Sequence, residues 1–167
     1  MATGRTVSRW VRFVLDDSGG TLREIPINSV NGVGLEYPET DVSAFQDAVK
    51  GVLSDQPDCS ITVTGPFDNA VVAACAASAA APTLSGSHTV LKALVGVNVP
   101  LALAVMIGIR GYYTTGDPSF GLDVTGTTSG FICTAYTPNP DDGTYSATFR
   151  VYPGSSAPSW IDDLPTS

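Results

Sequence analysis

Hydrophobic and polar residues alternate with a period of two in several segments of the chain, which is typical of β-strands with one buried face. Val11, Phe13 and Leu15 share one face of such a segment, and the turn residues Asp16–Gly20 lead into a returning arm over 21–25. The same alternation occurs over 59–64, 101–109, 130–136 and 145–152, with turn-forming residues at 138–143 between the last two segments. The pattern predicts a mostly-β chain.

One short helix is predicted near the middle of the chain. Ser87 can cap its amino end, and Val90, Leu91 and Leu94 form an apolar stripe. Gly96 suits the left-handed residue that follows the last turn of a helix. A helix of about two turns is stable only when such a stripe packs on a sheet, so we expect it to flank one.

Three stretches lack a clear strand pattern. The connection over 35–58 contains two prolines and several acids, and connections this long are usually functional or disordered. The alanine-rich segment over about 70–85 has the composition of an insertion, and a helix and a flexible loop both fit it. From about 153 the chain is rich in Ser, Pro and Asp and is predicted to be an irregular tail. No linker divides the chain, so residues 1–167 are interpreted as a single domain.

The chain is acidic but contains few charged residues. Its 167 residues include 8 Lys+Arg and 16 Asp+Glu, and the net charge of −8 disfavours sustained binding to nucleic acid. Charged residues make up 14% and hydrophobic residues 43%, which indicates that much of the surface meets other protein. Lys92 and Pro100 interrupt the most apolar stretch, and residues 1–9 have no apolar core. We therefore expect no membrane span and no leader, in a soluble protein made in a cytoplasm.

The residue types that usually build catalytic or metal sites are scarce. His88 is the only histidine, and its place in the first turn of the predicted helix indicates a structural, partly exposed residue. Cys59, Cys75 and Cys133 lie far apart, so we interpret them as reduced, mostly buried thiols and not as disulfides or zinc ligands. We expect no enzyme activity, no metal site and no cofactor.

Three further motifs have explanations simpler than a ligand site. Asp141–Gly143 lacks the remaining oxygen ligands of a calcium loop and fits a hairpin turn. The glycines of Asn31–Gly34 do not continue as a dinucleotide-binding motif and no helix pattern follows them. The acid pairs Asp16–Asp17 and Asp162–Asp163 are interpreted as solvated side chains.

Several short fragments occur in an order that is itself informative. They are Asp17–Ile25 (DSGGTLREI), Asn28–Val30, Asp41–Ala48 (DVSAFQDA), Asp58–Asn69 (DCSITVTGPFDN) and Thr144–Val151 (TYSATFRV), with Trp160 near the end. In this order and spacing they resemble the major tail (tail tube) proteins of long-tailed, siphovirus-like bacteriophages. The resemblance covers about 15–160. Ser43–Gln46 departs from the family's threonine-phenylalanine-glycine, and the alanine-rich segment is an addition.

The resemblance implies a fold, an assembly and partners. The fold is a β-sandwich or partial barrel with one short flanking helix and a long inter-strand loop, whose inner strands join between subunits into a closed barrel. Hexameric rings would stack into the hollow tube of the virion tail, through which genomic DNA is ejected. Partners would be further copies of the chain and the tape-measure, tail-tip and tail-terminator proteins. Synthesis would take place in the bacterial host cytoplasm, with no catalytic residue and no cofactor.

Two groups of residues follow as candidates for this role. Glu24, Glu36 and Asp123 lie in or beside predicted strands and could line an acidic bore that repels DNA at short range; ordinary surface acids are the alternative. In the 35–58 connection, Phe45 is the candidate anchor for a neighbouring subunit. Its polar rim would comprise Glu39, Asp41, Asp47 and Lys50, and a mobile surface loop is the alternative.

A second class of function fits the same composition. A β-sandwich binding or decoration module that recognises a surface ligand such as a carbohydrate would need exposed aromatic platforms. Tyr112–Tyr113 is the only adjacent aromatic pair in the sequence. Open sheet edges favour self-assembly over this alternative, because ring closure pairs the backbone groups that edge strands leave exposed.

Overall fold

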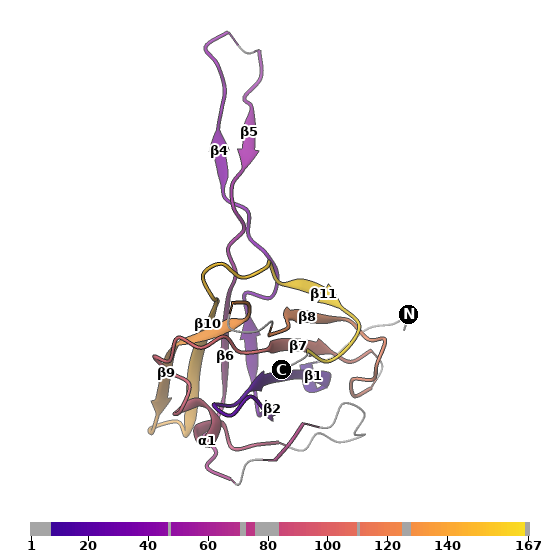
Figure 1. The fold of residues 1–167 in the computed structure, drawn as a ribbon, viewed down its shortest axis with the longest axis vertical. Helices are drawn as coiled ribbons and strands as arrows, with labels where there is room; N and C mark the ends of the chain where they lie inside the picture. Colours follow the sequence, from indigo (N-terminus) through magenta and orange to yellow (C-terminus); the bar gives the residue numbers. More distant parts are fainter. Residues whose placement is uncertain are drawn as a thin grey trace.

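The computed structural model of the chain describes residues 8–46, 48–70, 73–75, 84–109, 111–124 and 128–165. Two antiparallel sheets form the body, and a thin hairpin arm projects from one end of it (Figure 1). The predicted mostly-β sandwich with one short helix is confirmed.

The first sheet has five antiparallel strands in the order β11-β8-β7-β1-β2. A 3-10 turn over Ser8–Trp10 precedes β1. The strands are β1 (Val11–Asp16), β2 (Leu22–Ile25), β7 (Leu103–Ile107), β8 (Ser119–Leu122) and β11 (Ser159–Ile161). Phe13 pairs with Ile25 and Asp16 with Leu22, so the hairpin predicted from the turn residues is confirmed.

The second sheet has four antiparallel strands in the order β3-β6-β10-β9. They are β3 (Ser29–Asn31), β6 (Ser60–Pro66), β10 (Thr144–Val151) and β9 (Phe131–Asn139). In β6 and β10 every second residue is buried, as their period-two pattern predicts. β9 runs three residues further than predicted and includes Pro138, which is tolerated because β9 is an edge strand.

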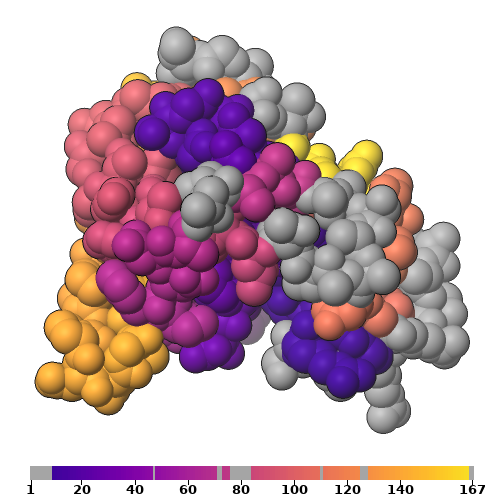
Figure 2. Space-filling view, turned by 90° about the horizontal axis from the view of Figure 1, so that it is seen from below, coloured from indigo at the N-terminus to yellow at the C-terminus, as the bar shows by residue number. Residues whose placement is uncertain are grey.

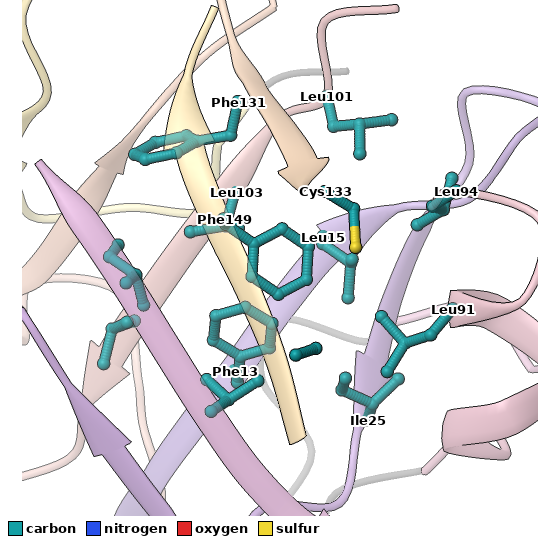
Figure 3. Packing of buried hydrophobic residues seen from close by; sticks show 14 of the residues in the cluster. Phe13, Leu15, Ile25, Leu91, Leu94, Leu101, Leu103, Phe131, Cys133 and Phe149 are labelled. Atoms are coloured by element: carbon teal, nitrogen blue, oxygen red, sulfur yellow. The ribbon is translucent and has the colours of Figure 1, made fainter. Parts of the chain in front are cut away.

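The inner faces of the two sheets meet in one apolar core (Figure 3). Phe13 of β1 and Phe149 of β10 lie with ring centroids 5.4 Å apart, which joins the two sheets directly. Leu91 and Leu94 enter the same core from the segment that contains the helix. The apolar faces read from the sequence are therefore the faces that pack.

The helix α1 (Ser87–Leu91) is shorter than predicted and has a different cap. Gly86 occupies the N-cap position, and no side chain caps it. The Ser87 hydroxyl instead donates to the Pro66 carbonyl at 2.9 Å and accepts from the Asp68 amide at 3.0 Å. The predicted apolar stripe is buried, Gly96 has a φ of 75°, and α1 contacts β2 and β9. The helix thus covers the side of the sandwich where these two edge strands lie.

The connection over 35–58 is a hairpin and not a structureless loop. β4 (Glu39–Asp41) pairs with β5 (Val52–Ser54) and the two project from the body (Figure 1). Every residue of both strands is exposed. A strand without a buried face needs no alternation of apolar and polar residues, which explains why the sequence pattern missed this hairpin.

The tail predicted to be irregular contains β11, which extends the first sheet beyond β8. Trp160 of β11 packs its ring against Phe120, with centroids 5.2 Å apart. Three residues between Pro158 and Asp162 are too few to show a period, so only the pairing with β8 defines this strand.

The outer edge of β2 is covered by the chain itself. The Cys75 amide donates to the Leu22 carbonyl at 3.1 Å, and the Ser85 amide donates to the Glu24 carbonyl at 2.7 Å. Ala73–Cys75 is not helical; residues 71–72 and 76–83 of the alanine-rich segment lie outside the described residues. The part that is described therefore adds to the β2 edge.

A small second cluster explains why both faces of the 101–106 segment are apolar. Ala104 and Met106 of β7 pack with Val14 and Tyr113 on the face away from the main core. Partly buried Leu22, Cys75 and Leu164 pack against them. Both faces of this segment are thus buried within one subunit. Across the described residues, the helices are all too short or too polar to cross a membrane.

Candidate self-assembly surfaces

The arm, defined here as residues 37–55, presents apolar side chains to solvent both at its tip and along β5. Phe45 is fully exposed, and Val49 and Leu53 are exposed by 81% and 62%. Large apolar groups on a projecting hairpin bury little surface in the subunit that carries them, and such exposure is typical of interaction sites. Phe45 is thus accessible on the arm, and its role as an anchor stays a prediction.

Polar contacts order the arm below its tip. The Asp41 carboxylate accepts from the Ser43 amide at 2.9 Å, and these hydrogen bonds with Ser43 lower the pKa of Asp41. The Ser43 hydroxyl accepts from the Gly51 amide at 2.7 Å, and Lys50 Nζ lies 3.4 Å from Asp41. Asp41 and Lys50 of the predicted rim thus pair with each other, Glu39 lies in β4, and Asp47 lies outside the described residues.

The base of the arm is tied to the second sheet. Glu36 and Asp58 exchange two backbone hydrogen bonds of 2.9 and 2.7 Å, and the Arg150 guanidinium donates to the Asp58 carboxylate at 2.6 Å. Gly32 has a φ of 77°, and a Cβ there would lie 1.9 Å from the Ser60 carbonyl oxygen. The close approach requires glycine at this position, so the direction in which the chain enters the arm is defined by backbone contacts.

Glu24 does not belong to the exposed acids. It is 2% exposed, and its carboxylate accepts from Arg12, with Nε to Oε1 at 2.9 Å. Burial raises the pKa of Glu24, and the contact with Arg12 opposes that rise. Since Val14 pairs with Glu24, Arg12 lies two residues along on the same face of the β1–β2 hairpin. Opposite charges on one face of a predicted hairpin were the signal that sequence reasoning missed.

Glu36 and Asp123 are both exposed, and each lies beside a surface groove. Asp58, the bridge partner of Glu36, lines one surface groove with Ser156, and Asp123 lines another with Ser156. Ser156 thus belongs to both grooves, one beside the base of the arm and one beside Asp123.

The acid pair Asp16–Asp17 is not solvated as expected. Asp16 is 3% exposed, its carboxylate accepts from the Ala102 amide at 2.9 Å, and burial raises its pKa. Asp17 accepts from the Gly19 and Thr21 amides in the turn and from Arg23 at 2.8 Å. Burial disfavours ionisation of Asp17, but these hydrogen bonds outweigh it and lower its pKa. Asp17 therefore stabilises the turn, whereas Asp16 ties the end of β1 to Ala102.

The groups with reactive chemistry are used structurally. Cys59 and Cys133 are buried thiols whose pKa burial raises to about 11, and Cys75 is a partly buried thiol. Such thiols are weak nucleophiles and poor ligands at neutral pH. His88 Nδ1 lies 2.9 Å from the Tyr136 hydroxyl, and its ring lies against Phe67. Over the described part of the chain, no group of three or more His, Cys, Asp or Glu side chains could hold a metal ion.

The aromatic pair considered for a binding module is divided by the fold. Tyr113 is buried in the second cluster, whereas Tyr112 is 40% exposed. One partly exposed ring does not make a platform for a carbohydrate, so this pair does not support the alternative function.

The fold is shared with solved structures of tube-associated proteins. A chain of the PVC sheath–tube complex, from an extracellular contractile injection system in the extended state, is 12% identical with a TM-score of 0.51; the match covers 90% of this chain and 88% of that one. The anti-feeding prophage cap, a tube-terminating cap, is 10% identical with a TM-score of 0.56 and coverage of 97% and 95%. The PVC sheath/tube terminator is 13% identical with a TM-score of 0.52 and coverage of 96% and 99%.

No protein-family model matches the sequence, and no curated protein matches it either. At 10–13% identity the structural matches establish the fold over nearly the whole chain. Their names describe a sheath–tube complex, a tube-terminating cap and a sheath/tube terminator. The chain therefore has a tail-tube-like fold.

Proposed function

We propose that this chain is a structural protein of the virion tail of a siphovirus-like bacteriophage, and that its copies form stacked hexameric rings. The rings would make the hollow tube through which genomic DNA is ejected. The observation that carries the proposal is the fold, shared over at least 90% of the chain with sheath–tube, cap and terminator structures. The ordered fragments from Asp17 to Trp160 support the same reading.

The edges of the sandwich supply a route to assembly. β3 and β11 are edge strands with mostly exposed side chains, whereas the β2 edge is covered by Cys75 and Ser85. Pairing of edge strands between copies would satisfy backbone groups and close the inner strands into a barrel. The proposed partners are therefore copies of the chain, with tape-measure, tail-tip and terminator proteins at the ends of the tube.

The experiment that tests this function is negative-stain electron microscopy of the purified protein over a range of concentrations. Rings or hollow filaments of uniform width are expected. A protein that stays monomeric at every concentration would instead favour the β-sandwich binding or decoration module.

A substitution tests the role of the arm. Phe45→Ala is expected to leave the melting temperature unchanged, because the side chain is fully exposed, and to reduce filament yield at least ~10-fold, as loss of a central anchor does. Gln46→Ala, at the exposed neighbouring position, is the matched control and should assemble normally. Filaments of normal length and yield from Phe45→Ala would show that Phe45 is not an anchor.

A further inference from the structure

Exposed apolar side chains gather at two opposite ends of the molecule. One group lies on the arm, around Phe45. The other lies on the segment after α1, where Val95, Val97 and Val99 are exposed by 38%, 44% and 55%. The arm projects from one end of the long axis, and α1 with the β1–β2 turn lies at the other (Figure 1). A subunit with apolar patches at both ends can bind a copy of itself head to tail.

The patch opposite the arm is hollowed. A cleft of about 230 Å³ lies between the turn Asp16–Gly20 and the segment Ala93–Leu101, and Val97, Val99 and Val124 line it. We call it the basal cleft. Figure 2 views this end of the molecule and shows the turn beside the segment that follows α1. The cleft is smaller than the ~300–1,000 Å³ typical of small-molecule sites, so its size suits one or two side chains.

The charges around the basal cleft also suit the arm. Lys92 is exposed beside Ala93 in the cleft wall, while the arm over 37–55 contains four acids and one lysine. The acids of the cleft do not oppose this, because Asp16 is buried against the Ala102 amide and Asp17 is paired with Arg23. An acidic arm with an apolar tip thus meets an apolar cleft with a cation at its rim.

We propose that the basal cleft is the docking site for Phe45 of a second copy of the chain. This inference rests on the self-assembly proposed above and adds which surface receives the arm. The contact joins two different surfaces and is heterologous, so each copy keeps one free arm and one free cleft. Successive copies therefore continue along the long axis, as stacking of rings requires.

Disulfide trapping tests the contact directly. The full chain with Phe45→Cys and Val97→Cys is expected to give a ladder of disulfide-linked species on non-reducing gels after mild oxidation. Phe45→Cys with Ser159→Cys is the matched control, since Ser159 is exposed in β11 at the end of the body that carries the arm. The wild-type chain shows the background from the native thiols. A ladder in the control pair and none with Val97→Cys would overturn the docking site.

A second variant separates this inference from the proposed function. Val97→Asp with Val99→Asp puts charges into the basal cleft at exposed positions and should leave the melting temperature unchanged while reducing filament mass at least tenfold. Val97→Thr, which adds no charge, should assemble. Normal tubes from the Asp variant would refute the docking site and leave the proposed function intact. If the wild type forms neither rings nor tubes, the proposed function fails and this inference with it.

Discussion

Arg12 and Glu24 form an ion pair inside an otherwise apolar part of the sheet. Both are 2% exposed, and the pair lies beside the thiol of Cys75, 3.8 Å from Arg12 Nη2. Taking two charges out of water is costly, and their mutual contact offsets that cost only while both are present. The pair is therefore sensitive to the loss of one partner.

Arg12→Ala is expected to lower the free energy of unfolding by about 3–5 kcal/mol, because it leaves the Glu24 carboxylate buried without its partner. The double change Arg12→Met with Glu24→Leu should cost much less, since it removes both charges. Urea denaturation at neutral pH measures both. If the single and double variants lost the same free energy of unfolding, the unpaired Glu24 carboxylate would not be the cause of the loss in Arg12→Ala.

Asp17 links one side chain to the pH dependence of stability. Its pKa in the folded state is below the ordinary value of 3.8, so the unfolded chain binds more protons in this range and stability rises with pH. The contribution is present above about pH 4 and is lost as the pH falls through the lowered pKa.

Asp17→Asn should therefore be less stable than wild type by about 1 kcal/mol at pH 7, with the difference shrinking as the pH falls below about 4. Thermal melting across this pH range measures the difference. Asp141→Asn, at an exposed acid, controls for the change in net charge and should follow the wild-type profile. If the variant were less stable than wild type by the same amount at every pH, the loss of stability would not come from the ionised carboxylate of Asp17.

Some secondary-structure elements have a pattern of apolar and polar residues that predicts them, and others do not. β6 and β10 bury alternate residues and were predicted, whereas β4 and β5 bury none and were not. β11 is a third case, because its three residues are defined by pairing with β8, far away in the chain.

Ending the chain at Pro153 tests whether the C-terminal segment is structural. The segment supplies β11, the Ser155 hydroxyl that accepts from the Gly130 amide at 3.0 Å, and Leu164 in the second cluster. Its loss should lower the melting temperature by about 5–10 °C, which corresponds to a few kcal/mol in a domain of this size.

Differential scanning calorimetry of the truncated chain measures this effect. Trp160→Ala keeps the β11–β8 hydrogen bonds and should have a smaller effect than the truncation. An unchanged melting temperature after truncation would agree with the irregular tail that the composition predicts.

At the scale of the whole molecule, the two ends of the subunit differ: the arm projects from one end and the basal cleft lies at the other. Glu36 and Asp123 are exposed, and their charges would matter only at short range, because the Debye length is about 8 Å at physiological salt. If they face the proposed bore, their repulsion of phosphate would keep DNA mobile.

Glu36→Lys with Asp123→Lys is therefore expected to give tubes of normal appearance that deliver DNA at least ~10-fold less efficiently, because added cations bind phosphate. Genome delivery by particles carrying the variant measures this. Asp141→Lys with Asp142→Lys, at the exposed turn between β9 and β10, is the matched control. Unchanged delivery by the first variant would show that these two acids do not line the bore.

Local patterns in the sequence were enough to define the β1–β2 hairpin, the alternating strands β6 and β10, and the apolar stripe of the helix segment. These features depend on residues within a few positions of one another, and their periods reflect which face is buried. The tail-tube-like fold suggested by the ordered fragments agrees with the structural matches.

Other features needed the tertiary structure, because they depend on partners distant in the chain. The sequence makes Glu24 a candidate for an acidic bore or an ordinary surface acid, and only its pairing with Arg12 shows that it is buried. The arm is a hairpin because β4 pairs with β5. The basal cleft is defined by the β1–β2 turn and the segment after α1, which are far apart in the sequence. Composition and periodicity decide which faces are buried, whereas long-range pairing decides which surfaces remain for another copy of the chain.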